Sequence, residues 1–157
     1  MIERDRQLQF MRLALEEAMK SQDEVPVGAV VVFDGQVIAA AHNERETAEN
    51  DPFGHAELLA MRKAAKALGR RRLSGCSLYV TLEPCPMCAG AMLMAEMERC
   101  YFGAFDARQG CCGSIYDLTN DPSFYHRVET AGGLCEAEAS ELLKAFFQNK
   151  RDKRAEK

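Results

Sequence analysis

Two short motifs constrain this chain more than any other feature: His55-Ala56-Glu57 and Pro84-Cys85-Pro86-Met87-Cys88. They supply one imidazole and two thiols, a set of borderline and soft ligands that suits Zn²⁺. Three protein ligands leave the fourth tetrahedral position of zinc open for water, the arrangement of a catalytic site. Because the motifs are distant in sequence, the fold must bring them side by side. The pattern predicts a zinc hydrolase.

Local structure at the two motifs favours this interpretation. Cys85 and Cys88 are three residues apart, so both thiols can share one face at the start of a helix, and Pro86 suits its first turn. A helix N-terminus favours the thiolate that zinc requires. Glu57 is not needed as a ligand. It comes two residues after His55 and is the candidate general acid/base.

Other interpretations of the motifs remain open. A structural zinc site requires a fourth protein ligand, and the only other histidines, His42 and His126, have no partner at ligand spacing. A Cys-x-x-Cys pair can also be redox-active. A zinc-stabilised binding module without catalysis is a further alternative, against which the uncommitted carboxylate of Glu57 argues.

Composition limits the class of protein. The 157 residues predict one domain over residues 1–150, followed by a charged tail over residues 151–157. The net charge of -4 excludes a general basic field, so any contact with nucleic acid must be local. No apolar run is long enough for a membrane span and no signal peptide is evident, which predicts a cytoplasmic protein. Seven cysteines, an odd number, argue against a disulfide framework.

Hydrophobic periodicity and turn signals predict alternating helices and strands. The pattern indicates an α/β layered domain in which helices cover a mixed sheet. Helices are predicted over residues 4–20, 55–68 (ending at Gly69), 85–97 and 136–149, with a short helical piece within 114–120. Strands are predicted over residues 27–33, 36–41, 76–82 and 99–103, with a further extended segment over 127–134.

The two motifs match the signature of zinc-dependent nucleobase deaminases. That signature alone fits deaminases of cytidine, cytosine, guanine, deoxycytidylate and tRNA adenosine. Over nearly its whole length, however, the chain resembles the bacterial tRNA adenosine deaminases. The matching segments are Val25–Val30, His42-Asn43, Asp51–Glu57, Leu78–Cys85, Met87–Ala91, Phe102–Ala104, Asp106, Gly113-Ser114, His126–Val128 and Phe146-Phe147.

The resemblance implies a three-layer α-β-α domain with a central mixed sheet of about five strands and helices on both faces. It implies one zinc ion per subunit, held by His55, Cys85 and Cys88, with Glu57 as general acid/base. The reaction would convert adenosine to inosine at the wobble position of a tRNA anticodon.

The resemblance also implies how the RNA is held. Asn43 would hydrogen-bond the flipped base and the Ala56 backbone would orient it, while Asp106 would contact the target nucleotide or its neighbour. The groove for the anticodon loop would be shaped by Tyr125, His126, Arg127 and Phe147, and partly by the second subunit of a homodimer. The alternative is a deaminase of a free base or nucleoside, of guanine or cytosine type, which needs a closed pocket instead of a groove.

Overall fold

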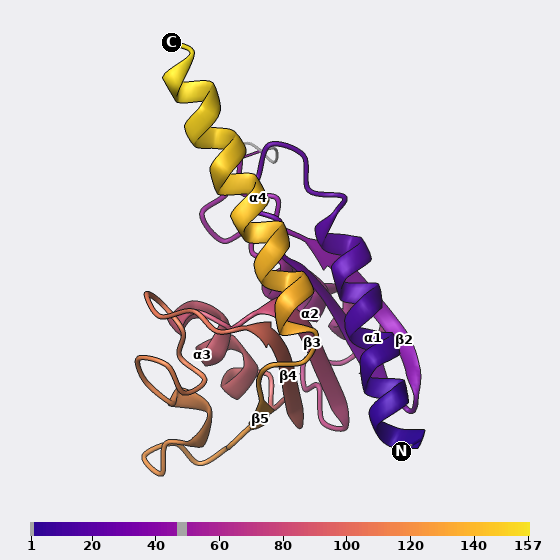
Figure 1. The fold of residues 1–157 in the computed structure, drawn as a ribbon. Helices are drawn as coiled ribbons and strands as arrows, with labels where there is room; N and C mark the ends of the chain where they lie inside the picture. The colour runs from indigo at the N-terminus through magenta and orange to yellow at the C-terminus, as the bar shows by residue number, and fades with distance from the viewer. Residues whose placement is uncertain (1, 47–49) are drawn as a thin grey trace.

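A five-stranded mixed sheet forms the centre of the computed structural model, which describes residues 2–46 and 50–157. The strand order is β2-β1-β3-β4-β5, with β1 antiparallel to both neighbours and β3, β4 and β5 mutually parallel (Figure 1). The strands are β1 (Gly28–Phe33), β2 (Gln36–His42), β3 (Cys76–Leu82), β4 (Arg99–Ala104) and β5 (Glu129–Ala131).

Helices cover both faces of this sheet, as predicted (Figure 1). α1 (Ile2–Ala18) and α4 (Glu136–Ala155) pack on one face, and α2 (Ala56–Leu68) and α3 (Pro86–Met94) on the other. A short 3-10 helix, η1 (Leu118–Asn120), lies beside α3. Neighbouring residues of β1 alternate between the layers: Val30 packs with Met11 of α1, and Val31 with the cluster beneath α2 and α3. The predicted α/β fold is confirmed.

Three features that depend on glycine determine how neighbouring elements connect and pack. Asp34 and Gly35 both have positive φ, 50° and 72°, as a two-residue hairpin turn between β1 and β2 requires. Gly69 ends α2 in the left-handed conformation, at φ 66°, which confirms the predicted C-cap. A Cβ added at Gly28 would lie 1.9 Å from the Ala14 carbonyl oxygen, so this glycine lets α1 pack closely on β1.

Two helices have different lengths from those predicted. α3 ends at Met94, not near residue 97, because Glu96 adopts a positive φ of 59° that a helix does not accommodate. α4 continues to Ala155, beyond the predicted end at residue 149, and projects past the body of the protein (Figure 1). Lys153 and Arg154 in its last turn are favoured by the helix dipole. Among the described residues, no helix is long and apolar enough to cross a membrane.

Candidate active site

One edge of the sheet carries the functional motifs, because strand register brings the relevant chain ends together. The start of β1 lies beside the end of β3, through the pair Ala29 and Val80, and beside the end of β2, through Gly28 and His42. The segments that follow β2, β3 and β4 therefore emerge at a common edge. In α/β sheets, ligands bind at the carboxyl ends of strands in this way.

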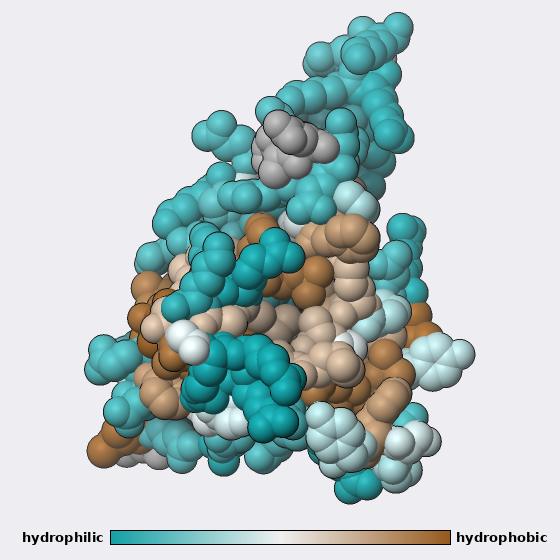
Figure 2. Space-filling view, turned by 180° about the vertical axis from the view of Figure 1, so that it is seen from behind, coloured by the Kyte–Doolittle hydropathy of each residue, from teal (hydrophilic) through white to brown (hydrophobic). Residues whose placement is uncertain are grey.

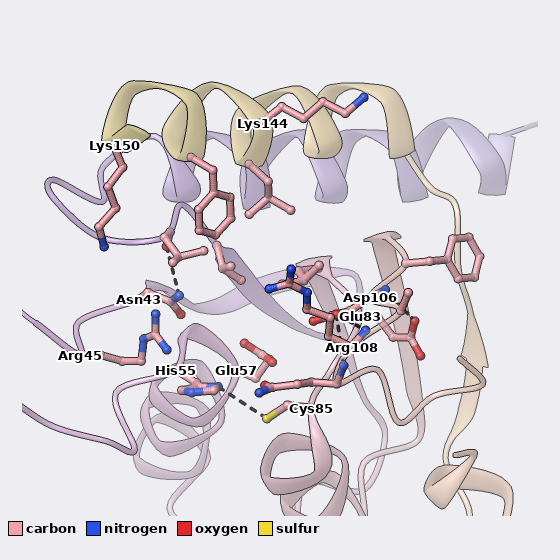
Figure 3. Close-up of a pocket in the computed structure, with 18 of the residues that line it drawn as sticks. Asn43, Arg45, His55, Glu57, Glu83, Cys85, Asp106, Arg108, Lys144 and Lys150 are labelled. Atoms are coloured by element: carbon pink, nitrogen blue, oxygen red, sulfur yellow. Dashed lines mark hydrogen bonds between the residues drawn. The ribbon is translucent and has the colours of Figure 1, made fainter. Parts of the chain in front are cut away.

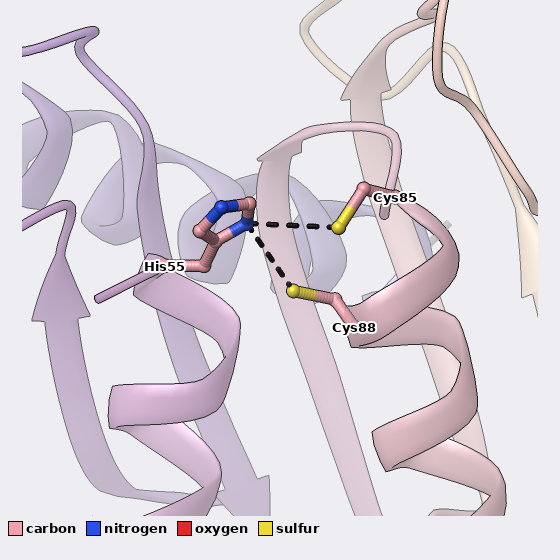
Figure 4. A group of neighbouring side chains, drawn as sticks. All are labelled: His55, Cys85 and Cys88. Atoms are coloured by element: carbon pink, nitrogen blue, oxygen red, sulfur yellow. Dashed lines mark hydrogen bonds between the residues drawn. The ribbon is translucent and has the colours of Figure 1, made fainter. Parts of the chain in front are cut away.

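The predicted ligands meet where α2 and α3 begin. His55 is the residue before the first turn of α2, Cys85 precedes α3, and Cys88 lies in the first turn of α3. The His55 Nδ1 atom lies 3.6 Å from Cys85 Sγ and 3.5 Å from Cys88 Sγ (Figure 4). Both thiols thus face the same imidazole nitrogen.

These distances fit zinc. Tetrahedral Zn²⁺ with Zn–N of about 2.0 Å and Zn–S of about 2.3 Å places its nitrogen and sulfur ligands roughly 3.5 Å apart. His55, Cys85 and Cys88 form one group whose ligand atoms all lie within 4.8 Å of one another, and no fourth side chain of the described residues joins that group. A structural site would need such a fourth ligand, so this donor set matches an open site.

The protonation of the thiols reflects their closeness. The hydrogen bond from Cys88, together with that from His55, lowers the pKa of Cys85 to about 4. The same pairing with Cys85, with burial, raises the pKa of Cys88, contrary to the expectation that the helix start favours both thiolates. The hydrogen bond to Cys85 raises the pKa of His55. Zinc binds deprotonated thiols and a neutral imidazole, so metal binding at these three groups would release protons.

Glu57 lies beside this group but outside it. It belongs to the first turn of α2, and its residue is only 4% exposed. Burial raises the pKa of its carboxyl group. A carboxyl group with a raised pKa can hold a proton and release it during a reaction. Figure 3 shows Glu57 next to His55 and Cys85 at the floor of the pocket.

Asn43 and Ala56 are joined directly. The Ala56 N–H donates a 2.9 Å hydrogen bond to Asn43 Oδ1, and Asn43 Nδ2 donates a 3.1 Å bond to the Val25 carbonyl. Asn43 is 5% exposed and lines the pocket. Because Nδ2 carries two hydrogens and Val25 accepts one, a second donor remains for a ligand.

A cavity of about 950 Å³ opens above the predicted metal ligands and is roofed by α4 (Figure 3). Asn43, His55, Glu57, Cys85, Asp106 and Phe147, all predicted from sequence, line it. Although the chain carries a net charge of -4, this cavity is lined by six basic side chains: Arg45, Arg108, Lys144, Lys150, Arg151 and Arg154. The basic field that composition excludes for the whole protein is thus present locally.

The structure does not bring Tyr125, His126 and Arg127 to this cavity. The Tyr125 hydroxyl donates to Glu96 Oε1 at 3.2 Å, and His126 Nε2 donates to the Met97 carbonyl at 2.8 Å. These anchors lie beyond the C-terminal end of α3, whereas the cavity is at its N-terminal end. Within one subunit, this segment is separate from the site.

Sequence reasoning missed two groups of pocket residues. Glu83 had no predicted role, although it directly precedes the Pro84-Cys85 motif. Of the basic residues of α4, Lys144 lay in the predicted helix over residues 136–149 without an assigned role, and Arg151 and Arg154 lay in the predicted charged tail over residues 151–157. Their signal was the helical spacing of the residues that line the cavity, namely Leu143, Lys144, Phe147, Lys150, Arg151 and Arg154. We call these six residues the α4 stripe.

The remaining cysteines and the run Arg70-Arg71-Arg72 lie outside the site. Cys76, Cys100, Cys111 and Cys112 are buried, and Cys135 is half-buried. In the run that follows α2, Arg70 donates to the carbonyls of Arg72 and Ser74. Arg72 pairs with Glu96. The run is therefore not part of the cavity lining.

Comparison with known proteins agrees with this fold and donor set. A family model described as the cytidine and deoxycytidylate deaminase zinc-binding region matches residues 4–104. The chain is 48% identical to the tRNA-specific adenosine deaminase of Bacillus subtilis (strain 168), over 92% of this chain and 91% of that protein. It is also similar to two solved structures.

One of these comes from biochemical and structural studies of A-to-I editing by tRNA:A34 deaminases at the wobble position. Its TM-score is 0.82 at 46% identity, covering 86% of this chain and 99% of the other. The second was crystallised in complex with 2,6-diaminopurine and has a TM-score of 0.75 at 25% identity, covering 89% and 80%.

Fold, donor set and family match define a zinc-binding hydrolytic deaminase. The chain belongs to the family that shares the cytidine and deoxycytidylate deaminase zinc-binding region and, within that family, to the tRNA-specific adenosine deaminases.

Proposed function

We propose that this protein deaminates adenosine to inosine at the wobble position of a tRNA anticodon, consuming water and releasing ammonia. The observation that carries the proposal is an open, locally basic cavity directly above the His55, Cys85 and Cys88 donor set. A polynucleotide substrate needs such a surface because its phosphates bind to basic side chains. The family relationship supports the same substrate.

In this proposal His55, Cys85 and Cys88 hold zinc, and Glu57 carries protons. Zinc, when bound, supplies a water of lowered pKa. Glu57 carries two protons in turn: one from the attacking water to the ring nitrogen, and a second from the newly added hydroxyl group to the amine, which leaves as ammonia. Its burial keeps bulk water from these protons, and it is not one of the three predicted ligands.

Asn43 and Ala56 would orient the base. The free Nδ2 hydrogen of Asn43 is available to a ring acceptor, while its bonds to Ala56 and Val25 keep the amide from rotating. Asp106 would contact the target nucleotide or its neighbour from the rim. Its Oδ1 already accepts from the N–H groups of Arg108 and Gln109, which leaves Oδ2 for the RNA.

The α4 stripe would bind the RNA backbone and one unstacked base. Lys150 extends from α4 toward the side of the cavity that holds Asn43 (Figure 3). Phe147, 43% exposed, offers a ring on which a base can stack. We infer that residues 1–150 form the deaminase domain and that the charged residues 151–157, which continue α4, extend its RNA-binding end.

We further infer a cytoplasmic homodimer. Several large apolar side chains are exposed on the surface, among them Met94 at 77%, Tyr116 at 68% and Tyr125 at 86%. Seen from behind, brown apolar side chains gather between teal polar groups across the middle of the molecule (Figure 2). A second copy would cover apolar surface and could carry Tyr125, His126 and Arg127 to the neighbouring cavity. Light scattering that gives a monomer mass at assay concentrations would contradict this inference.

One assay tests the substrate. Zinc-loaded protein is given an anticodon stem-loop with adenosine at the wobble position, and inosine is measured. The alternative, a free-base or nucleoside deaminase of guanine or cytosine type, is favoured only by the structural similarity to a protein that binds 2,6-diaminopurine. Ammonia release from guanine or cytosine, with no inosine in the stem-loop, would establish the alternative.

A further inference from the structure

The side chain of Glu83, at the end of β3, is buried among donors of a single loop. The residue is 2% exposed, and no ion pair joins it to a basic residue of the described chain. Its Oε1 accepts from the Asp106 N–H at 3.0 Å and from the Ser114 hydroxyl at 2.5 Å. Its Oε2 accepts from the N–H groups of Cys112 at 3.1 Å and Ser114 at 3.0 Å.

The loop that supplies these donors covers residues 105–114, and we call it the rim loop. It wraps closely around the carboxylate: a Cβ added at Gly110 would lie 2.4 Å from Glu83 Cδ. It is also fastened beside the metal ligands, because the Cys111 N–H donates to the Pro84 carbonyl at 2.9 Å. One short run, Glu83-Pro84-Cys85, therefore holds the loop and supplies a predicted ligand.

The rim loop forms the wall of the cavity beside Glu83 and Cys85. Phe105, Asp106, Ala107, Arg108 and Gln109 all line the cavity. The cavity-lining part of the loop, residues 105–109, is mostly exposed, whereas Cys111 and Cys112 are buried in the core. The exposed part has little apolar burial of its own, so the hydrogen bonds of Glu83 contribute strongly to its shape. A carboxylate offers about four acceptor positions, and here all four are used. Glu83 therefore has no acceptor left for a substrate.

We propose that Glu83 is a positioning residue that fixes the rim loop so that Asp106 and Arg108 meet the nucleotides beside the target base. This proposal rests on the proposed function, from which it takes RNA as the substrate. Glu83 acts through the loop: it determines how well RNA is bound, while the proton transfer and the metal site are left to other residues.

The chemistry of an amide makes Glu83→Gln a sharp test. If the new NH₂ replaced Oε2, it would face the two backbone donors of Cys112 and Ser114, neither of which can become an acceptor. If it replaced Oε1, the Ser114 hydroxyl could reverse and accept from it, and only the Asp106 N–H would lose its partner. The amide should take the second orientation and release the end of the loop that carries Asp106.

The variants Glu83→Gln, Ser114→Ala and their combination are compared in zinc-loaded protein, with Glu129→Gln on the edge strand β5 as a matched control. Glu83→Gln should raise KM for the anticodon stem-loop by about tenfold, since a buried donor loses its partner, with kcat changed less than about threefold. Zinc content should stay at one ion per chain. Ser114→Ala should raise KM by less than about threefold.

The double variant should exceed the product of the two single effects, because Ser114 compensates only in the Gln background. Amide hydrogen exchange without RNA should accelerate in the rim loop of Glu83→Gln and not in that of Glu129→Gln. If Glu83→Gln does not fold, Gly110→Ala tests the same contact from the loop side and should also raise KM.

The outcomes separate the two proposals. An unchanged KM and unchanged loop exchange in Glu83→Gln, a loss confined to kcat, or a loss of zinc in proportion to the loss of binding would overturn the role of Glu83. Wild-type protein that forms no inosine in the stem-loop would count against the proposed function alone, and hydrogen exchange would then still decide on Glu83.

Discussion

The metal corner and the rim of the cavity differ in how they are held. The metal corner consists of His55, Glu57, Cys85 and Cys88, which come from two helix starts; Glu57 and Cys88 are 4% and 0% exposed. The rim consists of the α4 stripe and the rim loop, with Phe147 at 43% and Phe105 at 53% exposed. In the proposed function, chemistry would therefore occur where packing fixes the atoms, and RNA would bind where side chains remain free to adjust.

This difference implies that changes at the corner should lower kcat or remove the metal, whereas changes at the rim should act on KM and salt dependence. The two regions are joined by Glu83, whose substitution should behave as a rim change although the residue is as buried as the corner. Substitutions in each region test whether kcat and metal binding depend on the corner while KM depends on the rim.

The largest effect is expected from Cys88→Ser. A hydroxyl is a poorer zinc ligand than a thiolate, and Cys88 is one of only three protein ligands in the predicted set. We expect loss of zinc, loss of activity and a lower melting temperature together, because metal binding is linked to folding. Metal analysis and thermal unfolding measure this. Cys76→Ala, a buried cysteine at the far end of β3, should lower stability but keep zinc. Full zinc content in Cys88→Ser would exclude it as a ligand.

Glu57→Ala should separate metal binding from chemistry. The variant should keep one zinc per chain but lose about 10²- to 10⁴-fold in kcat, the usual contribution of a positioned proton carrier. Inosine formation and metal analysis on the same sample measure both. Glu98→Ala, whose side chain is 52% exposed, provides the control and should be unchanged. A rate near that of the wild type would remove Glu57 from the mechanism.

The sequence predicts the corner far better than the rim, for physical reasons. His55, Cys85 and Cys88 are recognisable because zinc chemistry demands those residue types at helix starts. Strand β3, at Cys76–Leu82, is found with the predicted bounds because apolar and β-branched residues form one short run between turn signals.

The role of Glu83 had no comparable signal. Its partners are 23 to 31 residues later, and three of its four bonds come from backbone N–H groups that any residue would supply. The end of α4 was misjudged because its charged residues resemble a solvated tail. Side-chain bonds within the helix, from Gln148 to Asp152 and from Arg151 to Gln148, stabilise the helix there.

Removal of charge from the α4 stripe should weaken RNA binding and leave kcat and zinc content unchanged. Lys150→Gln combined with Arg151→Gln should raise KM for the stem-loop on the order of tenfold at moderate salt. The slope of log KM against log salt should fall by about 1 to 2, because two phosphate contacts are lost. The matched control, Lys66→Gln with Arg71→Gln, removes two exposed charges near the C-terminal end of α2, away from the predicted metal ligands. This control should leave the slope unchanged. An unaltered slope in the stripe variant would mean that RNA binds elsewhere.

The smallest effect is expected at Phe147, a rim residue whose single aromatic ring should affect KM and not kcat. If a base stacks on it, Phe147→Ala should raise KM by about fivefold, near the lower end of one stacking contact, without a change in kcat. Phe147→Tyr keeps the aromatic face and should behave as wild type, whereas Phe147→Leu keeps an apolar side chain of similar size and should resemble Ala. If Leu restored binding, Phe147 would serve as packing against Phe146, whose ring centroid lies 5.3 Å away, and the base would be held by other parts of the rim.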